Sequence, residues 1–292
     1  MGIRLTLRDI EILDALHTAR YMTTPQIQAL FWRESRGGEA GRLKACQRRL
    51  RFLTKHGLVR RIEQLVSRGE GRLPYIYALD KRGGEALIRE LGVDPASIDW
   101  RKKDVERTYP FLQHVLATND FRISVKLACE RLSTVKLEVW ADEKQLKMEA
   151  KDYVTITGPE GEEQKVAVVP DGYFVLRQGE RLAHHFLEID RATVTVRPSQ
   201  WQRRGWVRKI QAYLAYYESG IFTERYATRS MRILTITTGP DRLAHLKEVT
   251  EETGGKARFW FTTFELANDP KKILTEPIWQ VASQEGLHRL LP

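Results

Sequence analysis

Three acidic residues within one short stretch, residues 166–191, are the best candidates for chemistry in this chain. Two runs of apolar, β-branched and aromatic residues flank the polar turn 178–180, a pattern typical of a β-hairpin. Glu188 and Asp190 stand two positions apart in the second run, so on a strand their side chains point to the same face. Asp171 lies in the first run, and pairing of the strands would bring it beside them. The pattern therefore predicts that three carboxylates converge.

Carboxylates at one place repel each other unless they share a cation or a proton, so such a cluster is typical of a site. Mg²⁺ and Mn²⁺ prefer oxygen ligands and would relieve the repulsion. The alternative is an exposed strand end whose acids are simply hydrated, and the spacing alone does not separate the two. We predict a metal site at Asp171, Glu188 and Asp190, with Mg²⁺ or Mn²⁺ as the cofactor.

This stretch resembles the PD-(D/E)xK signature of the restriction-endonuclease-like fold. The residues that carry the resemblance are Pro170, Asp171, Glu188, Ile189 and Asp190. The resemblance implies that Asp171 and Glu188 hold the metal ion, that Asp190 helps, and that the ion activates water against a phosphodiester. The sequence departs from the signature in one place, because Asp190 stands where a lysine is usual. Lys209, in a later helix, or Lys165 would have to supply the positive charge.

The net charge of +10 and the pI near 9.6 indicate an acidic partner. The excess is concentrated, because residues 33–72 hold twelve Lys or Arg and only four Asp or Glu. Helices are expected at residues 7–19, 23–31 and 41–56, followed by a hairpin at 58–80. The candidate DNA-binding residues on the third helix and the hairpin are Arg42, Lys44, Arg48, Arg49, Arg51, Lys55, Arg60, Arg61, Arg68 and Arg72.

Three helices followed by a basic hairpin resemble a winged helix-turn-helix. In that architecture the third helix enters the major groove of duplex DNA and the wing contacts the backbone or the minor groove. Two plainer interpretations stay open, since basic helix faces are often only hydrated and winged helices also bind proteins. The excess positive charge lies on both the third helix and the hairpin, which favours DNA as the binding partner.

The length of 292 residues favours two domains. We predict a winged helix-turn-helix domain at 1–95, a linker at 96–110 and a second domain at 111–292. In the second domain, helical and strand periodicity alternate. The expected elements are a helix at 111–132, strands at 135–143, 165–177 and 181–192, a helix at 206–217, a strand at 231–238, a helix at 241–252 and a strand at 257–266. This αβββαβ order, within an α/β (α+β) chain, is that of the restriction-endonuclease-like fold.

Other chemistry finds little support in the sequence. It contains no P-loop, CxxC pair or GxSxG motif. His184 and His185 are adjacent on a predicted strand and face opposite ways, so at most one could join the acids. Cys46 and Cys129 are too few for a disulfide scaffold, and no stretch is apolar enough to span a membrane. We expect a cytoplasmic protein.

The two halves together resemble the replication-relaxation family. The residues that carry this resemblance are His114, Asn119, Pro170, Asp171, Gly172, Glu188, Ile189, Asp190, Arg191 and Trp279. It implies a protein of a plasmid or other mobile element that binds double-stranded DNA and acts in replication, DNA relaxation or transfer. Replication or transfer proteins are further expected partners, and a homodimer is left open.

Two alternatives to that function remain. One is an active metal-dependent DNA endonuclease or nickase, which retention of all three acids favours. The other is a winged-helix transcriptional regulator. Loss of the motif lysine favours a role in binding and regulation, so the sequence leaves enzymatic activity undecided.

Overall fold

The structure of the chain is a computed structural model. It describes residues 4–33, 38–64, 73–98, 109–149, 151–158, 160–193, 196 and 205–291. The chain divides into two compact units, Met1–Ile123 and Ser124–Pro292. The division falls within α5 (Tyr109–Leu132) rather than in the predicted linker 96–110, most of which lies outside the described residues.

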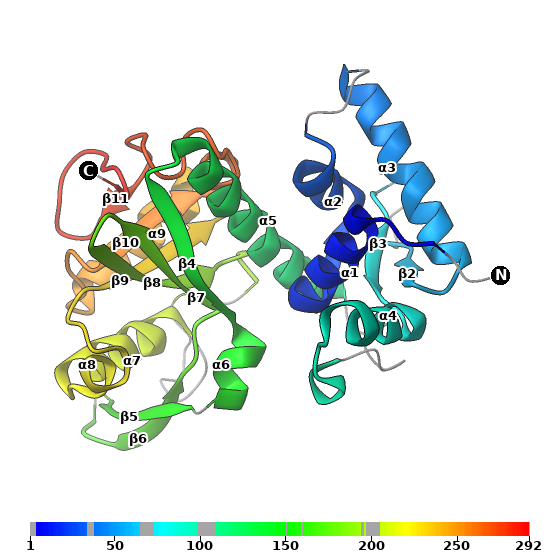
Figure 1. Cartoon of the computed structure of the whole chain (residues 1–292). Coiled ribbons are helices and arrows are strands. Elements are labelled where there is room, and N and C mark those ends of the chain that lie inside the picture. Colours follow the sequence, from blue (N-terminus) through cyan, green and yellow to red (C-terminus); the bar gives the residue numbers. More distant parts are fainter. Residues whose placement is uncertain are drawn as a thin grey trace. The chain divides into compact units, whose positions relative to one another are not determined.

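The first unit has the element order of a winged helix (Figure 1). Its three-stranded sheet has the order β1-β3-β2, with antiparallel pairs throughout. The elements are α1 (Leu7–Ala19), β1 (Tyr21–Thr23), α2 (Thr24–Phe31), α3 (Gly38–Lys55), β2 (Val59–Ile62), β3 (Ile76–Leu79), α4 (Lys81–Leu91) and the 3₁₀ turn Pro95–Ser97. The sequence predicted the three helices and the hairpin but not β1. The tip of the predicted wing, with Arg68 and Arg72, lies outside the described residues.

Two amide side chains attach the first half of α5 to this unit. Gln26 closes a capping box with Thr23 at the start of α2, and its Nε2 also donates to the Leu116 carbonyl at 2.9 Å. Asn119 is buried and its Nδ2 donates to the carbonyls of Ala19, at 3.1 Å, and Tyr21, at 2.7 Å. Asn119 therefore satisfies backbone groups where α1 ends and β1 begins, which explains its presence structurally.

The second unit is built on a six-stranded sheet with the order β11-β10-β9-β8-β7-β4. β4, β7 and β8 form an antiparallel meander, and β9 returns parallel to β8 after the crossover helix α7. The elements are β4 (Val135–Asp142), β7 (Gly172–Gln178), β8 (Arg181–Ile189), α7 (Trp206–Glu218), α8 (Ile221–Tyr226), β9 (Met231–Thr237), α9 (Pro240–Glu252), β10 (Phe259–Thr263), α10 (Phe264–Ala267) and β11 (Gln280–Val281). Together with α5, this is the predicted αβββαβ order in a mixed α/β protein.

An insertion between β4 and β7 was not predicted. It consists of α6 (Glu143–Glu149) and a separate two-stranded hairpin, β5 (Asp152–Thr157) with β6 (Glu163–Val168). The predicted strand 165–177 is thus two strands. Pro170 lies in the link between them, where the missing N–H breaks no ladder, rather than in the middle of one strand.

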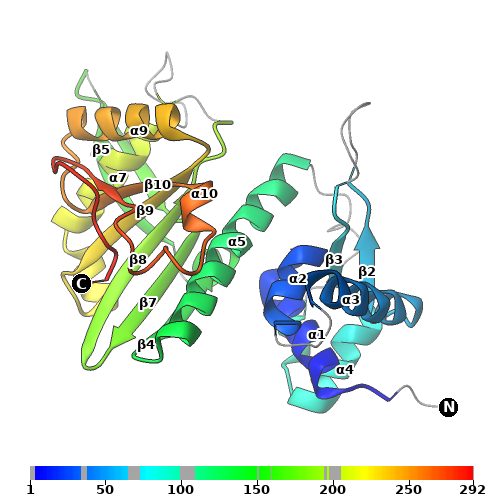
Figure 2. The ribbon, with the colours of Figure 1, turned by 90° about the horizontal axis from the view of Figure 1, so that it is seen from above.

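The core of the second unit lies between one face of the sheet and the helices α7 and α9. Ile210 and Leu246 from the helices pack with Phe186, Ile233 and Phe261 from the strands, all fully or almost fully buried. The C-terminal half of α5 runs along the opposite face (Figure 2). Within the described part of the chain, no helix has the length and apolar character needed to cross a membrane.

Candidate active site

The β7–β8 hairpin brings Asp171 and Glu188 to the same end of the sheet. Asp171 directly precedes β7, where its backbone N–H donates to the Leu187 carbonyl at 3.0 Å. The Asp171 carboxylate then accepts a hydrogen bond from the backbone N–H of Ile189 at 2.8 Å. Its neighbour Glu188 is on β8 and faces α7. The strand pairing therefore holds Asp171 firmly beside the position of Glu188.

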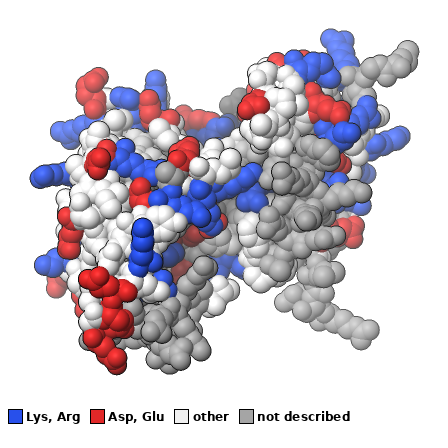
Figure 3. Space-filling model, turned by 90° about the horizontal axis from the view of Figure 1, so that it is seen from below, with Lys and Arg blue, Asp and Glu red and all other residues white. Residues whose placement is uncertain are grey.

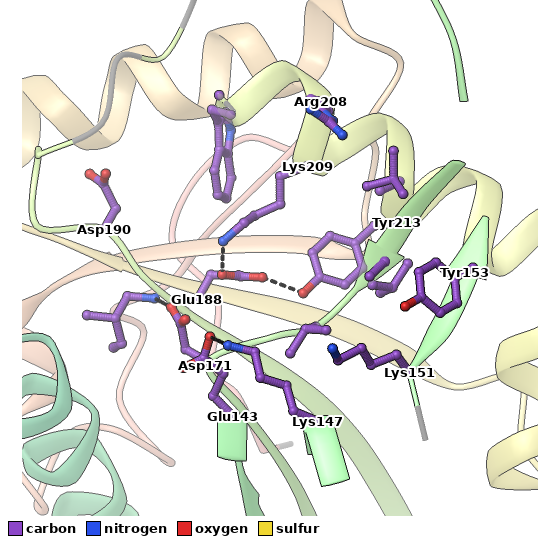
Figure 4. Close-up of a pocket in the computed structure, with 18 of the residues that line it drawn as sticks. Glu143, Lys147, Lys151, Tyr153, Asp171, Glu188, Asp190, Arg208, Lys209 and Tyr213 are labelled. Atoms are coloured by element: carbon purple, nitrogen blue, oxygen red, sulfur yellow. Dashed lines mark hydrogen bonds and ion pairs between the residues drawn. The ribbon is translucent and has the colours of Figure 1, made fainter. Parts of the chain in front are cut away.

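Glu188 is buried, with 1% of its surface exposed, and receives two donors from α7 (Figure 4). The ammonium of Lys209 and the hydroxyl of Tyr213 each donate to one carboxylate oxygen. Burial raises the pKa of Glu188 to about 7, and the charge of Asp171 adds to this, while Lys209 opposes it. Glu188 thus titrates near neutrality.

Lys209 is the residue whose positive charge contacts Glu188. It comes from the crossover helix, whose packing against the sheet through Trp206 and Ile210 fixes the start of its side chain. Burial lowers the pKa of Lys209, but the charges of Glu188 and Asp171 together outweigh burial, so the pKa is raised. The alternative, Lys165, is on β6 with its ammonium 5.1 Å from the ring centre of Tyr153.

Asp190 lines the same cavity but is engaged elsewhere. Its carboxylate accepts two hydrogen bonds from the guanidinium of Arg242, at 2.8 and 2.9 Å, and one from the Thr237 hydroxyl at 2.7 Å. Figure 4 shows its oxygens pointing away from Glu188. Among the described residues no group of three or more His, Cys, Asp or Glu is placed to hold a metal ion. The predicted convergence of three acids is corrected to a pair, Asp171 and Glu188.

Neither neighbouring histidine joins the acids. His184 Nδ1 is hydrogen-bonded to the Tyr173 hydroxyl at 2.7 Å. His185 is fully buried on the other face and stacks on Phe174, and burial lowers its pKa to about 3. Both are packing residues of the sheet.

A cavity of about 510 Å³ opens above the acid pair. Positive side chains surround it from three elements, because Lys147 lies on α6, Arg208 and Lys209 on α7, and Arg242 on α9. The insertion adds Lys151 and Tyr153. Two carboxylates beneath a cavity bordered by cations suit a ligand that is anionic and is bound partly through a metal.

Two carboxylate groups are a sufficient oxygen donor set for Mg²⁺ or Mn²⁺. Mg²⁺ sites commonly use only one or two carboxylates and fill the remaining positions with water and substrate phosphate oxygens. The residues that fit the ion are Asp171 and Glu188. Lys209 would then exchange its contact with Glu188 for one with the substrate.

In the first unit, the described residues among the predicted DNA-binding set fall into two groups, according to whether they share one exposed face of α3. Lys44, Arg48, Arg51 and Lys55 are exposed and follow each other at intervals of four, three and four residues. This spacing puts them on one face of the helix. They form what we call the α3 stripe.

Arg51 of the stripe donates to the Gln47 carbonyl one turn earlier in α3, at 3.4 Å, and the other described cations of the set have partners outside α3. Arg49 forms a two-pronged ion pair with Asp9, which is fully buried. Arg42 donates to the Arg33 carbonyl at 3.0 Å, and Arg60 lies 3.4 Å from Asp80. Arg61 is exposed, lies 3.5 Å from Glu63 and covers the Tyr75 ring. Arg49 in particular is held within the fold.

Sequence reasoning missed Tyr213, Arg242 and the residues of the insertion. Tyr213 carried a usable signal, because it stands four positions after Lys209 and so shares its helix face. Arg242 carried none, since it lies 52 positions from Asp190.

Comparison with known proteins gives one family match and two similar solved structures. Residues 13–230 match the model of the replication-relaxation family. No curated protein matches the sequence.

Two solved structures of the restriction endonuclease FokI are similar. The DNA-bound form is 12% identical, with a TM-score of 0.28 over 91% of this chain and 45% of that chain. The second FokI structure is 11% identical, with a TM-score of 0.27 over 91% of this chain and 44% of the FokI chain. This chain thus corresponds to less than half of the FokI chain. The family match covers most of the sequence, including parts of both units, and it shows that the chain belongs to the replication-relaxation family.

Proposed function

We propose that this protein binds double-stranded DNA and cleaves one of its phosphodiester bonds in a metal-dependent reaction, during replication or relaxation of a mobile genetic element. The observation that carries the proposal is the position of Lys209. Its ammonium contacts Glu188 beside Asp171, so the acids and the lysine of a nuclease-like site are together despite the aspartate at position 190.

Each side chain of the site then has a chemical role. Asp171 and Glu188 would hold Mg²⁺ or Mn²⁺, which supplies Lewis-acid activation of water and neutralises charge on the phosphate. Lys209 is placed to stabilise the negative charge that develops on the attacked phosphate. Tyr213 holds Glu188 in its rotamer by donating to the oxygen that Lys209 does not contact. Asp190 keeps the end of β8 in place through Arg242.

The first unit would bring the site to duplex DNA. The α3 stripe is the exposed basic face of the third helix of the first unit. If this unit is a winged helix, α3 is the helix that enters the major groove. Several phosphate contacts by such side chains release counterions, so binding would depend steeply on salt.

A second candidate is a DNA-binding factor whose nuclease-like unit does not cut. The observation that favours it is that both oxygens of Glu188 are already engaged by Lys209 and Tyr213. In that case the ion pair is a permanent part of the fold. The two candidates differ in one measurable result, the cleavage of DNA.

Incubation of supercoiled plasmid with the protein and Mg²⁺ or Mn²⁺ tests the proposal. Nicked or linear product should form with the wild type and disappear with both Asp171→Asn and Glu188→Gln. Lys209→Ala should slow cleavage by on the order of 10²–10³-fold, as for loss of other groups that stabilise transition-state charge. The matched control is Glu224→Gln, which changes an exposed carboxylate of α8 outside the cavity.

Absence of product with either ion, from a folded protein that binds DNA, would replace cleavage with the second candidate. Product that persists in both acid variants would move the active site elsewhere in the chain.

A further inference from the structure

The insertion between β4 and β7 forms one wall of the cavity above Asp171 and Glu188. Val154 and Ile156 on β5 are buried in the same core as Tyr216 of α7, so the hairpin is anchored against the crossover helix. The wall is therefore a fixed part of the site. An anchored wall has a definite shape that a substrate must match.

The side of the wall that borders the cavity carries a basic and aromatic set of residues. Tyr153 has 46% of its surface exposed, although the next residue on β5 is buried. Lys147 on α6 and Lys151 just before β5 border the cavity beside it (Figure 4). Lys147 is paired with Glu143, whereas Lys151 has no ion-pair partner among the residues that the structure describes.

Positive charge also faces the cavity from α7, through Arg208 and Lys209. Figure 3 shows Lys and Arg side chains close together on one face of the second unit. A path with cations on both sides attracts a polyanion along its length. The Lys165 ammonium lies 5.1 Å from the centre of the Tyr153 ring. The exposed part of this ring adds an apolar surface, which a chain of phosphates alone would not need.

The depth of the acids restricts the form in which DNA can reach them. Glu188 is only 1% exposed, at the base of a cavity of about 510 Å³. A cavity of this size accepts a ligand of the size of one or two nucleotides. A nucleotide within a duplex is stacked and paired, whereas an unpaired strand is narrower and its bases are free to leave the stack. A single strand therefore fits the cavity better than an intact duplex does.

We propose that the wall formed by α6, β5 and β6 binds one unpaired DNA strand, with a base stacked on Tyr153 and the backbone phosphates next to Lys147 and Lys151. This combination of a basic groove with an aromatic platform is how proteins bind single strands without reading their sequence. The inference deepens the proposed function and rests on it, because the strand is the one presented to Asp171 and Glu188. The first unit binds duplex, and the second takes a single strand.

Binding without cleavage tests this inference. The full-length protein is titrated in EDTA against a fluorescein-labelled duplex and against the same duplex carrying a short single-stranded gap, with anisotropy as the readout. The wild type should bind the gapped DNA more tightly. Tyr153→Ala should weaken binding to the gapped DNA by about five- to 140-fold, the range expected for loss of one base stack. It should leave binding to the intact duplex unchanged.

Matched variants show whether the ring itself is responsible. Tyr153→Phe keeps the ring and should bind like the wild type. Lys151→Ala should decrease the slope of log affinity for gapped DNA against log salt by about one, because one phosphate contact is lost. Tyr109→Ala removes a tyrosine of similar exposure, 48%, at the start of α5 and should change nothing.

Equal affinity for the two DNAs, or an unchanged gap preference in Tyr153→Ala, would overturn the inference. Plasmid nicking alongside that result would leave the proposed function standing. If the protein prefers gapped DNA through Tyr153 but never nicks plasmid, the single-strand binding inferred here would hold. The cleavage reaction of the proposed function would then be rejected.

Discussion

Each unit contains one deeply buried carboxylate paired with a cation from a neighbouring helix. In the first unit, Asp9 on α1 is 0% exposed and pairs with Arg49 on α3. In the second, Glu188 on β8 is 1% exposed and pairs with Lys209 on α7. Burial alone would raise the pKa of both acids. The pKa of Asp9 is nevertheless lowered, whereas that of Glu188 is raised.

The number and kind of donors explain the difference. Burial acts to raise the pKa of Asp9, but Arg49 contacts both its oxygens and Thr6 adds a backbone and a hydroxyl donor at 2.6 and 2.7 Å, so the pKa is lowered. Glu188 has one cation, one neutral hydroxyl and a second acid nearby, and burial raises its pKa to about 7. A fully satisfied pair fixes a helix, whereas an under-neutralised acid beside a cavity is suited to take up another cation.

The largest expected effect concerns the stability of the Asp9 pair. Arg49→Ala leaves a buried charge without its partner, and loss of one partner of a buried pair costs about 3–5 kcal/mol. Lys209→Ala should lower the free energy of unfolding by only about 1 kcal/mol at pH 6, because Glu188 can take up a proton there at little cost. Urea denaturation of both variants at pH 6 measures the difference.

Asp9 adds a pH signature to this comparison. Its folded pKa is depressed, so its contribution to stability is present above the unfolded pKa and is lost as the pH falls through the lower folded value. Arg49→Ala should remove that acid-side loss of stability. Equal destabilisation by Arg49→Ala and Lys209→Ala would contradict the distinction between a structural and a functional pair.

These two pairs also show how far the sequence reaches. The hairpin around residues 178–180 and the αβββαβ order were predictable, because strand periodicity and helix position follow from local pattern. Lys209 as the substitute lysine stays a prediction. The role of Arg49 was not, since it and Arg48 look identical in a basic helix. Only the structure shows that Arg49 forms an ion pair with Asp9 while Arg48 is exposed.

The site was only partly predictable for the same reason. Asp190 stands two positions after Glu188, and side chains two positions apart on a strand point to the same face. Strand geometry alone therefore placed Asp190 beside the other acids. β8 ends at Ile189, however, and Asp190 turns to Arg242 on a helix much later in the chain. The insertion escaped notice because residues 165–177 read as one apolar run, although Pro170 in that run marked the break.

A smaller effect separates the cations of α3 in DNA binding. The double variant Arg48→Ala and Arg51→Ala removes two members of the α3 stripe, so the slope of log affinity for duplex DNA against log salt should decrease by about two. The fold should be unaffected, because neither side chain is buried. Anisotropy titrations at several salt concentrations measure the slope.

Arg42→Ala is the matched control for this experiment, since its guanidinium is bound to the Arg33 carbonyl. It should leave the slope close to that of the wild type. A slope that is unchanged in the double variant would show that another surface binds the duplex.

The smallest expected effect is the dependence of metal affinity on pH. Glu188 has a folded pKa of about 7, so below that pH it carries a proton that an incoming Mn²⁺ must displace, and above it the carboxylate is already ionised. The groups that face Glu188 are Asp171, Lys209 and Tyr213, and the raised pKa values of Lys209 and Tyr213 keep both protonated over this range. One proton is thus released per ion bound.

The affinity for Mn²⁺ should accordingly strengthen by about tenfold per pH unit as the pH rises toward 7, and then level off, as expected for displacement of one proton. Calorimetric titration of the full-length protein at several pH values measures this profile. Glu188→Gln should bind more weakly and show no such rise, because the amide does not titrate. A wild-type affinity that is independent of pH would mean that Glu188 is not a ligand. The Glu188 pair would then be structural, like that of Asp9 and Arg49.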